Sequence, residues 1–419
     1  MSSPLYLLKT QRFGPLFATQ FLGAFNDNLF KNTLAVILTF QAAKWTALSP
    51  SLLAPLIGAL FILPFFLFSG MAGELADKYD KARLTRIVKL LELFLMVLAS
   101  IGFALHSLEL LFSVIFGLGL HSTFFGPIKY SILPQHMHDN ELISANALVE
   151  SGTFAAILLG TLSGGILSTY ANGGVLAGVA GMILALAGYV ASRHIPNAPS
   201  LSHEIPLSLN PITPTLHSIT LARQTPVVFV SILAISWFWL YGALLLTQLP
   251  AFVKITLESN ETTVTLLLAL FTVGIGAGSM LCDHLSHHTI RPSLIAVGAV
   301  GMALFGIDFG LTAQHFQTAD SLYSNLSFWH ILIDLTLIGV FGGLYSVPLY
   351  AVMQSRSDPE FRSRIIAANN ILNALFMVTG AVITIALLNQ GWDIPDIFLT
   401  IAFAMALVAG IISFKLRNI

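Results

Sequence analysis

The chain contains the sequence GELADKYDKAR (residues 73–83) at the end of a long apolar segment. In the second half, the sequence GSMLCD (residues 278–283), followed by Arg291, ends another apolar segment in the same way. A second correspondence is clearer, because ISANAL (residues 143–148) and IAANNI (residues 366–371) both open apolar segments. Stretches that recur in the same order indicate that the chain consists of two related halves.

The composition identifies the broad class of protein. Of the 419 residues, 56% are apolar and 9% are charged, whereas a soluble domain has roughly 25% charged residues. Apolar runs of about 18 or more residues recur along the whole length, and each is long enough for a transmembrane helix. We therefore expect an all-α polytopic membrane protein. The net charge of −1 gives no indication of nucleic-acid binding, and the single cysteine, Cys282, excludes an intrachain disulfide.

Twelve apolar segments are expected to cross the membrane. The segment 194–223 separates six from six, and its composition, which includes Pro206, is typical of a linker. This pattern predicts an N-terminal six-helix bundle at 1–193, a cytoplasmic linker at 194–223 and a C-terminal six-helix bundle at 224–419. The predicted spans are 14–40, 51–73, 84–106, 109–133, 142–169, 174–193, 226–252, 262–282, 292–313, 328–353, 364–389 and 396–416.

The basic residues predict the orientation. If both termini lie in the cytoplasm, the loops on the opposite side contain only Lys44 and Lys254, as the positive-inside rule requires. We therefore expect a multi-pass protein of the bacterial cytoplasmic membrane with both termini inside. The loops on the cytoplasmic side then contain Lys9, Arg12, Lys78, Lys81, Arg83, Arg86, Arg193, Arg223, Arg291, Arg356, Arg362, Arg364, Lys415 and Arg417.

Residues 73–83 resemble the loop signature of the major facilitator superfamily, although Asp80 stands where glycine is usual. The resemblance implies the twelve-helix fold of that superfamily and transport by alternating access. It also implies that the acidic residue contacts the cytoplasmic ends of neighbouring helices and latches one state, since unpaired amides at a helix N-terminus stabilise a carboxylate. The second copy of the signature is degenerate. The residues that match the latch are Gly73, Asp77, Lys78, Arg83 and Asp283.

A narrower resemblance follows from four blocks, which are similar to the bacterial lysophospholipid transporters, free-standing or fused to an acyltransferase. It implies that the chain moves lysophospholipids, chiefly lysophosphatidylethanolamine, from the outer to the inner leaflet of the cytoplasmic membrane. The expected partners are the lysophospholipid, the membrane lipids and an acyltransferase acting on the transported lipid. We expect a monomer and no cofactor. The blocks are QFLGAFNDN (20–28), GPIKYSIL (126–133), NALVE (146–150) and AAILLG (155–160).

One feature departs from that family. The seventh span of the lysophospholipid transporters is expected to contain a basic residue. The corresponding residues of this chain, 227–252, contain none. This departure favours a rival cargo, in which a proton-coupled exporter moves an amphiphilic drug, a siderophore or another metabolite.

Asp27 is the most informative single residue. It lies with Asn28 and Lys31 in an otherwise apolar span, where a charge is costly unless a partner or a water-filled cavity receives it. The default interpretation is a place in the transport path. The alternative is a neutralised pair with Lys31, which lies one helical turn away and would only fix packing.

Three further residues are candidates for the path. Lys129 could meet a lipid phosphate as a point charge, and Glu150, one turn beyond Asn146, could accept hydrogen bonds from an ethanolamine ammonium. The alternatives are that Lys129 extends to the lipid headgroups, or that Lys129 and Glu150 form a structural pair.

His330 and Asp334, one turn apart in the tenth span, are candidates for proton coupling. Asp308 in the ninth span is interpreted as a packing or edge residue. The loop residues Cys282, Asp283, His284, His287 and His288 suggest a metal site, but a solvated loop is the better interpretation and we expect no metal.

Two further interpretations concern Glu92 and catalysis. Glu92 follows Lys89 by three residues and is expected in a helical charge ladder near the cytoplasmic face. An enzyme needs a nucleophile with a base, but His121 and Ser122 are helix neighbours that point roughly 100° apart. No zinc-protease or serine-hydrolase spacing occurs, so we expect no enzymatic activity.

Overall fold

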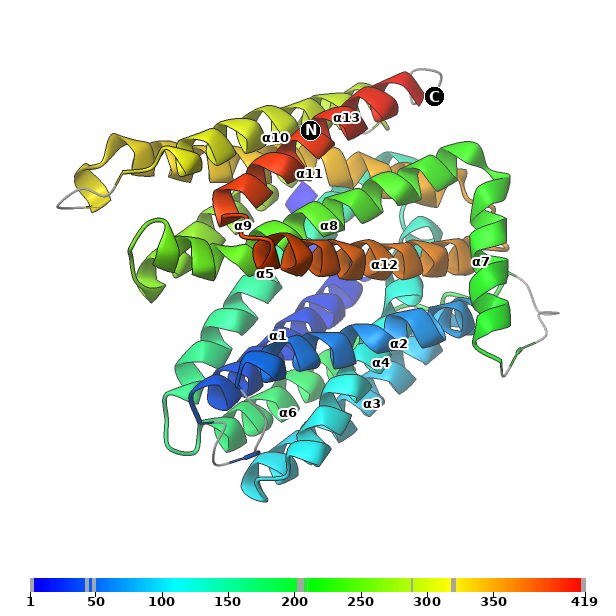
Figure 1. Ribbon diagram of the computed structural model, residues 1–419. Helices are drawn as coiled ribbons and strands as arrows, with labels where there is room; N and C mark the ends of the chain where they lie inside the picture. The colour runs from blue at the N-terminus through cyan, green and yellow to red at the C-terminus, as the bar shows by residue number, and fades with distance from the viewer. Residues whose placement is uncertain are drawn as a thin grey trace. The chain divides into compact units, whose positions relative to one another are not determined.

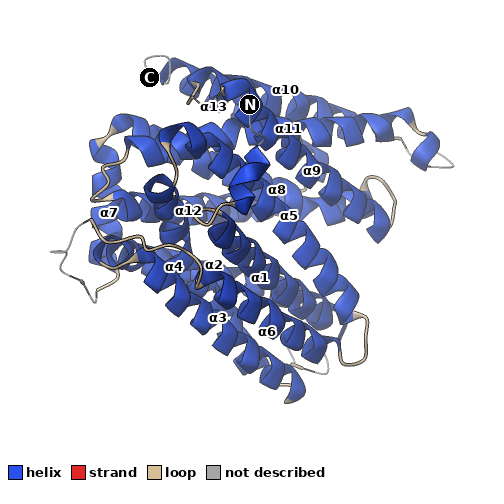
Figure 2. Ribbon diagram, turned by 180° about the vertical axis from the view of Figure 1, so that it is seen from behind, coloured by secondary structure: helices blue, strands red, loops and turns tan. Residues whose placement is uncertain are grey.

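A computed structural model describes residues 4–41, 45–46, 50–201, 207–208, 210–287, 289–317 and 322–415. Four residues named above, Lys44, Pro206, His288 and Arg417, lie outside the described residues. All regular structure in the described part of the chain is helical (Figures 1 and 2). The prediction of an all-α membrane protein is therefore confirmed.

The long helices follow the predicted spans closely. Among the described residues, eleven helices are long and apolar enough to cross a membrane. α1 has 28 residues and is long enough to cross a membrane. It is not among the eleven, because the polar residues around Asp27 lower its hydropathy. The helices are α1 Gly14–Gln41, α2 Pro50–Lys78, α3 Lys81–Ala104, α4 Leu108–His136, α5 Leu142–Ser168, α6 Gly173–Ser192, α7 Ile212–Gln224, α8 Pro226–Ile255, α9 Glu261–Ser286, α10 Pro292–Gln314, α11 Leu326–Arg356, α12 Arg362–Asn389 and α13 Ile394–Lys415.

The repeated signature lies at the end of a helix rather than wholly in a loop. The first six residues of 73–83 continue α2 to Lys78, and the chain then turns at Tyr79 and Asp80. Asp80 is the N-cap of α3, since its Oδ1 accepts the backbone N–H of Arg83 at 2.8 Å. An aspartate is a strong N-cap, which gives a physical reason for the departure from glycine at this position.

The predicted linker is partly helical and is packed against the first half. α7 spans Ile212–Gln224 and packs on α2, where Gly70 of α2 lies against the backbone at Pro214. Before α7, the backbone N–H of Ala198 donates to Asp80 Oδ2 at 2.8 Å, and Ser200 donates to the carbonyl of Asp77 at 2.7 Å. This part of the segment is therefore fixed to the ends of α2 and α3.

The chain divides into two compact units. Unit 1 comprises Met1–His138, Ala155–Gln224 and Ser357–Ile371, and unit 2 comprises Asp139–Phe154, Thr225–Arg356 and Leu372–Ile419. The first part of α5 thus clusters with unit 2, and the first turns of α12 cluster with unit 1.

Within unit 1, α6 packs against α1 and α3, and α4 packs against α2 and α3 (Figure 1). Its apolar core lies between these helices, and includes Phe30, Met96 and Leu118, which are fully buried. Within unit 2, α11 packs against α8, α9 and α10, and α10 packs against α13 (Figure 1). Phe252, Phe309 and Phe398 form an aromatic cluster between α8, α10 and α13, with ring centroids 5.3–5.6 Å apart.

Candidate functional site

The buried carboxylate of Asp27 lies between α1 and α4 in unit 1. Its Oδ2 accepts a hydrogen bond from Ser122 Oγ at 2.5 Å, and only 6% of the residue is exposed. Its Oδ1 has no hydrogen-bond partner among the described residues. Asp27 therefore keeps a free acceptor in the interior of a helical bundle.

Among the described residues, Lys31 forms no ion pair with this carboxylate. Its ammonium lies over the ring of Phe61 in α2, 4.8 Å from the ring centroid. A cation over an aromatic face is stabilised without a counter-ion. Asp27 and Lys31 thus present an anion and a cation one helical turn apart, each held by a neutral partner.

The neighbouring asparagines are bonded to the backbone. Asn28 donates to the carbonyl of Ala24 at 2.8 Å, and Asn32 donates to the carbonyl of Thr161 in α5 at 2.7 Å. The Asn32 bond fixes α1 against the second part of α5, which also belongs to unit 1.

A second group of charges lies deeper in unit 1. Lys89 and Glu92 of α3 form an ion pair, and both side chains are completely buried. Glu92 also accepts from Asn26 Nδ2 at 2.7 Å and contacts His121 Nε2 at 3.2 Å. The expected i,i+3 pairing of Glu92 with Lys89 is therefore present, and the pair is buried in the interior of the bundle.

A glycine makes room for this ion pair. A Cβ atom added at Gly188 of α6 would lie 2.7 Å from Lys89 Cε, closer than real contacts allow.

The neighbours His121 and Ser122 have different partners, Glu92 and Asp27, as expected for adjacent residues of one helix.

The three other predicted path residues are divided between the units. Lys129 in unit 1 is half-buried, with its ammonium 4.3 Å from the centroid of the Tyr130 ring. In unit 2, Asn146 exchanges two hydrogen bonds with Gln354 of α11, at 2.8 and 3.0 Å. Asn146 also donates to the carbonyl of Leu142, so its amide is fully engaged. Glu150, one turn further along α5, is completely buried.

The carboxylate of Asp77 caps the N-terminus of α12 within unit 1. Its Oδ1 accepts the backbone N–H of Ser363 at 2.9 Å, and its Oδ2 accepts the backbone N–H of Arg364 at 3.2 Å. The side-chain Nε of Arg364 also donates to Oδ2 at 3.1 Å. All of these groups are buried, so the contact combines a helix cap with a buried ion pair.

The remaining signature residues surround that contact. Gly73 permits close packing, because a Cβ there would lie 2.8 Å from Arg364 Cα and from Ala367 Cβ. Lys78 ends α2 and is half-buried, and the Arg83 side chain is exposed in the first turn of α3. Arg83 thus takes part through its backbone N–H, which Asp80 caps.

Unit 2 contains a related contact at the end of α9. Asp283, which is 5% exposed, accepts a short hydrogen bond from Ser144 Oγ near the start of α5. The carboxylate at the end of α2 therefore contacts the start of α12, and the carboxylate at the end of α9 contacts the start of α5. The repeat in the sequence is matched by a repeat in these contacts.

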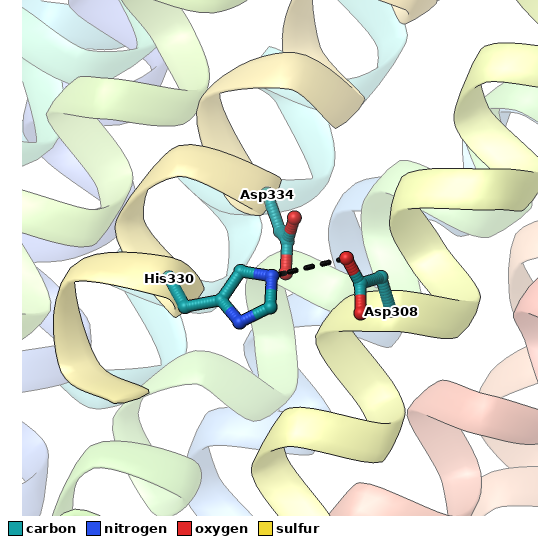
Figure 3. Close-up of side chains that lie close together, drawn as sticks. All are labelled: Asp308, His330 and Asp334. Atoms are coloured by element: carbon teal, nitrogen blue, oxygen red, sulfur yellow. Dashed lines mark hydrogen bonds and ion pairs between the residues drawn. The ribbon is translucent and has the colours of Figure 1, made fainter. Parts of the chain in front are cut away.

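His330 and Asp334 of α11 meet a third residue in unit 2. His330 Nε2 lies 3.0 Å from Asp308 Oδ2 of α10 and 3.6 Å from Asp334 Oδ2 (Figure 3). Asp308 was interpreted as a packing or edge residue, and the structure places its half-exposed carboxylate against the imidazole of His330. Asp308 and His330 are about half exposed, while Asp334 is buried.

Sequence reasoning missed several partners in these contacts. Ser122, Gln354, Ser144 and Arg364 are ordinary helix residues, and each became visible only through a contact between distant segments. Lys89 is the exception, because its spacing of three residues from Glu92 already indicated a charge pair on one helix.

The sequence is similar to those of known proteins. The lysophospholipid transporter LplT of Klebsiella pneumoniae (strain 342) is 30% identical over 351 aligned residues, which cover 80% of this chain and 78% of that protein. LplT of Escherichia coli O157:H7 (strain EC4115 / EHEC) is 30% identical over 348 residues, with the same two coverages of 80% and 78%.

Two solved structures have the same fold. The E. coli fucose:proton symporter FucP superposes with a TM-score of 0.73 at 15% identity, over 99% of this chain and 99% of that one. An outward-facing bacterial homologue of the iron transporter ferroportin gives a TM-score of 0.69 at 16% identity, over 97% of this chain and 99% of that one. A family model described as Major Facilitator Superfamily matches residues 16–381. The chain belongs to the major facilitator superfamily.

Proposed function

We propose that this protein is a secondary transporter that moves lysophospholipids, such as lysophosphatidylethanolamine, from the outer to the inner leaflet of the cytoplasmic membrane. The observation that carries the proposal is the 30% identity to lysophospholipid transporters over four fifths of the chain. The four sequence blocks quoted above belong to the same relationship. The chain acts as a carrier and not as an enzyme in this proposal.

The chemistry of α1 fits a zwitterionic headgroup. Asp27 has an unused carboxylate oxygen that can accept hydrogen bonds from an ammonium group. The ammonium of Lys31 lies over the face of Phe61 and forms no ion pair among the described residues, so it can meet a phosphate. Residues four apart on a helix have Cβ atoms roughly 5–6 Å apart, close to the span of a phosphoethanolamine group.

The remaining candidates have supporting roles in this proposal. Lys129 offers a second cation for the phosphate, and the buried Glu150 offers a second anion. Asn146 supports α5 through Gln354 and does not bind substrate itself while that pair is intact.

Alternating access requires contacts that form in one state and break in another. The cap that Asp77 places on α12 and the bond between Ser144 and Asp283 are such contacts. In this proposal, 1–193 and 224–419 are the moving bodies, both termini are cytoplasmic, and the Asp77 contact closes the cytoplasmic side. Gly73 allows the close approach, and Lys78 and Arg83 flank it.

Two further points complete the proposal. The protein acts as a monomer and supplies lysophospholipid to an acyltransferase on the inner leaflet. Proton coupling through His330 and Asp334 is the proposed energy source if transport responds to a pH gradient.

The rival proposal is a proton-coupled exporter of an amphiphilic drug, a siderophore or another metabolite. The observation that favours it is the absence of a basic residue between 227 and 252.

The two cargoes separate in one experiment. Proteoliposomes containing the protein are supplied with labelled lysophosphatidylethanolamine, with labelled diacyl phosphatidylethanolamine, and with an amphiphilic dye under an imposed pH gradient. We expect uptake of the single-chain lipid well above empty vesicles and above the diacyl lipid. Lipid uptake equal to that of empty vesicles, together with movement of the dye, contradicts the proposal and supports the exporter.

A further inference from the structure

Three potential metal ligands converge near one end of α10 and α11. One imidazole nitrogen and two carboxylate oxygens, from His330, Asp308 and Asp334, all lie within 4.8 Å of one another. Figure 3 shows both carboxylates directed at the same nitrogen of the His330 ring. Residues 308, 330 and 334 come from two helices that pack along much of their length, so the backbone holds the three groups together.

We propose that Asp308, His330 and Asp334 form a binding site for a divalent transition-metal cation, with Zn²⁺ as the representative ion. This site is separate from Asp27 and Lys31 and is independent of the cargo. It shares His330 and Asp334 with the proton-coupling role proposed above, and a bound cation would take the place of a proton there.

The distances match those of a metal site, and the shorter one is also that of the hydrogen bond between His330 Nε2 and Asp308 Oδ2. Zinc lies roughly 2.0–2.2 Å from nitrogen and carboxylate ligands, so neighbouring ligand atoms in a tetrahedral site are roughly 3.3 Å apart. The two separations from His330 Nε2, 3.0 Å to Asp308 and 3.6 Å to Asp334, lie on either side of that value. Three protein ligands leave one position for water or another donor.

Asp334 provides independent support. Its side chain is 2% exposed, and its Oδ2 receives no hydrogen bond from the described residues. A buried carboxylate without a donor is costly, and a cation at this place removes that cost. The oxygen that lacks a donor is the one that points at the ring nitrogen of His330.

The second nitrogen of the ring is also positioned. His330 Nδ1 lies 3.4 Å from Thr312 Oγ1, which is one turn beyond Asp308 on α10. A partner on the far nitrogen of a metal-binding histidine fixes the orientation of the ring. Thr312 therefore turns Nε2 toward the two carboxylates.

The site is accessible to a cation. Asp308 and His330 are 48% and 47% exposed, in the last two turns of α10 and the first turns of α11. α11 has 31 residues and is about 46 Å long, which exceeds the roughly 30 Å thickness of the bilayer core.

A mixed nitrogen and oxygen donor set favours Zn²⁺ or Mn²⁺ over Mg²⁺ and Ca²⁺. A bound ion would cross-link α10 and α11 within unit 2.

The test measures Zn²⁺ binding to the purified, chelator-treated protein in detergent by isothermal titration calorimetry. We expect one site, and a loss of affinity of at least about tenfold in Asp334→Asn and in Asp308→Asn. Thr312→Val should weaken binding by a smaller factor. The matched control is Asp396→Asn, which alters a carboxylate that accepts from Gln314 at the same end of unit 2 and should leave binding unchanged.

A second readout covers variants that fold poorly. Zn²⁺ should raise the melting temperature of the parent protein and of Asp396→Asn, but not of Asp308→Asn, whose exposed side chain tolerates the change. Equal affinity in the parent and in Asp334→Asn overturns the proposal. So does a site that disappears on changing His284 and His287, since the ion would then bind at the C-terminal end of α9.

Discussion

Arg364 donates twice to one oxygen of Asp77, through its backbone N–H at 3.2 Å and through its side-chain Nε at 3.1 Å. Asp77 lies in the last turn of α2, and Arg364 lies in the first turn of α12. One carboxylate thus satisfies unpaired amides at a helix start and neutralises a guanidinium that is 5% exposed. The two elements are held together by charge as well as by packing.

This relationship predicts that Asp77→Ala destabilises the protein strongly. The change leaves the buried guanidinium of Arg364 without an anion, which costs on the order of 3–5 kcal/mol in the free energy of unfolding. Asp77→Asn retains one acceptor oxygen and should cost less. Thermal unfolding in detergent measures both, and Asp139→Asn, which alters an exposed carboxylate, is the control. An unchanged melting temperature in Asp77→Ala would show that the contact is not formed in solution.

The sequence was sufficient for the helices but not for their contacts. Apolar runs and linker composition located the long helices, since both are properties of local sequence. The end of α2 was placed at residue 73 rather than Lys78, because Glu74, Asp77 and Lys78 reduce the apolar signal without ending the helix. Polar residues near the membrane face can continue a transmembrane helix.

The partners within the candidate sites could not be predicted for a different reason. Gln354 lies 208 residues from Asn146, and Ser122 lies 95 residues from Asp27. Spacing on one helix offered only the alternative of a pair between Asp27 and Lys31, because residues three or four apart are the side-chain neighbours that a single helix defines. The tertiary fold supplied Ser122 and the ring of Phe61 instead, and nothing in the local sequence indicates either one.

Lys89 and Glu92 are expected to act as a structural pair. Because both are fully buried, Lys89→Met alone leaves the carboxylate of Glu92 without the ammonium that pairs with it, and Glu92→Gln alone leaves a buried cation. Each single change should lower the free energy of unfolding by about 3–5 kcal/mol. The double variant should recover most of that loss, since a neutral pair of similar volume needs no counter-charge. A double variant as unstable as the sum of the singles contradicts this prediction.

Asn146 and Gln354 are expected to depend on one another. Asn146→Ala leaves the buried amide of Gln354 without its partner, at a cost of about 1–3 kcal/mol. Asn146→Ala combined with Gln354→Leu removes both polar groups and should be more stable than the single variant. The double-mutant cycle in thermal unfolding measures the coupling. Additive effects on the melting temperature would indicate that each amide has other partners. Loss of transport in a fully stable double variant would favour direct contact of this pair with the substrate.

Asp27 provides the sharpest test of the transport path. Asp27→Asn preserves the shape of the side chain and can still accept from Ser122, so the protein should remain folded. It removes the negative charge proposed to receive the ammonium group, and uptake of lysophosphatidylethanolamine should fall by at least about tenfold, since each 1.4 kcal/mol of lost interaction is a factor of ten. Uptake in proteoliposomes and melting temperature in detergent are measured on the same preparations.

The double variant Asp27→Asn with Lys31→Met distinguishes a substrate site from an ion pair. If the two residues only neutralised each other, the double change would restore both stability and transport. Because Lys31 lies over Phe61 and Asp27 binds Ser122, we expect no rescue of uptake and little change in melting temperature in either variant. Ser122→Ala is the matched control for local packing, and should reduce uptake less than Asp27→Asn because the carboxylate remains. Full uptake by the double variant would exclude Asp27 from the transport path, since the charge would then be dispensable whenever Lys31 is absent.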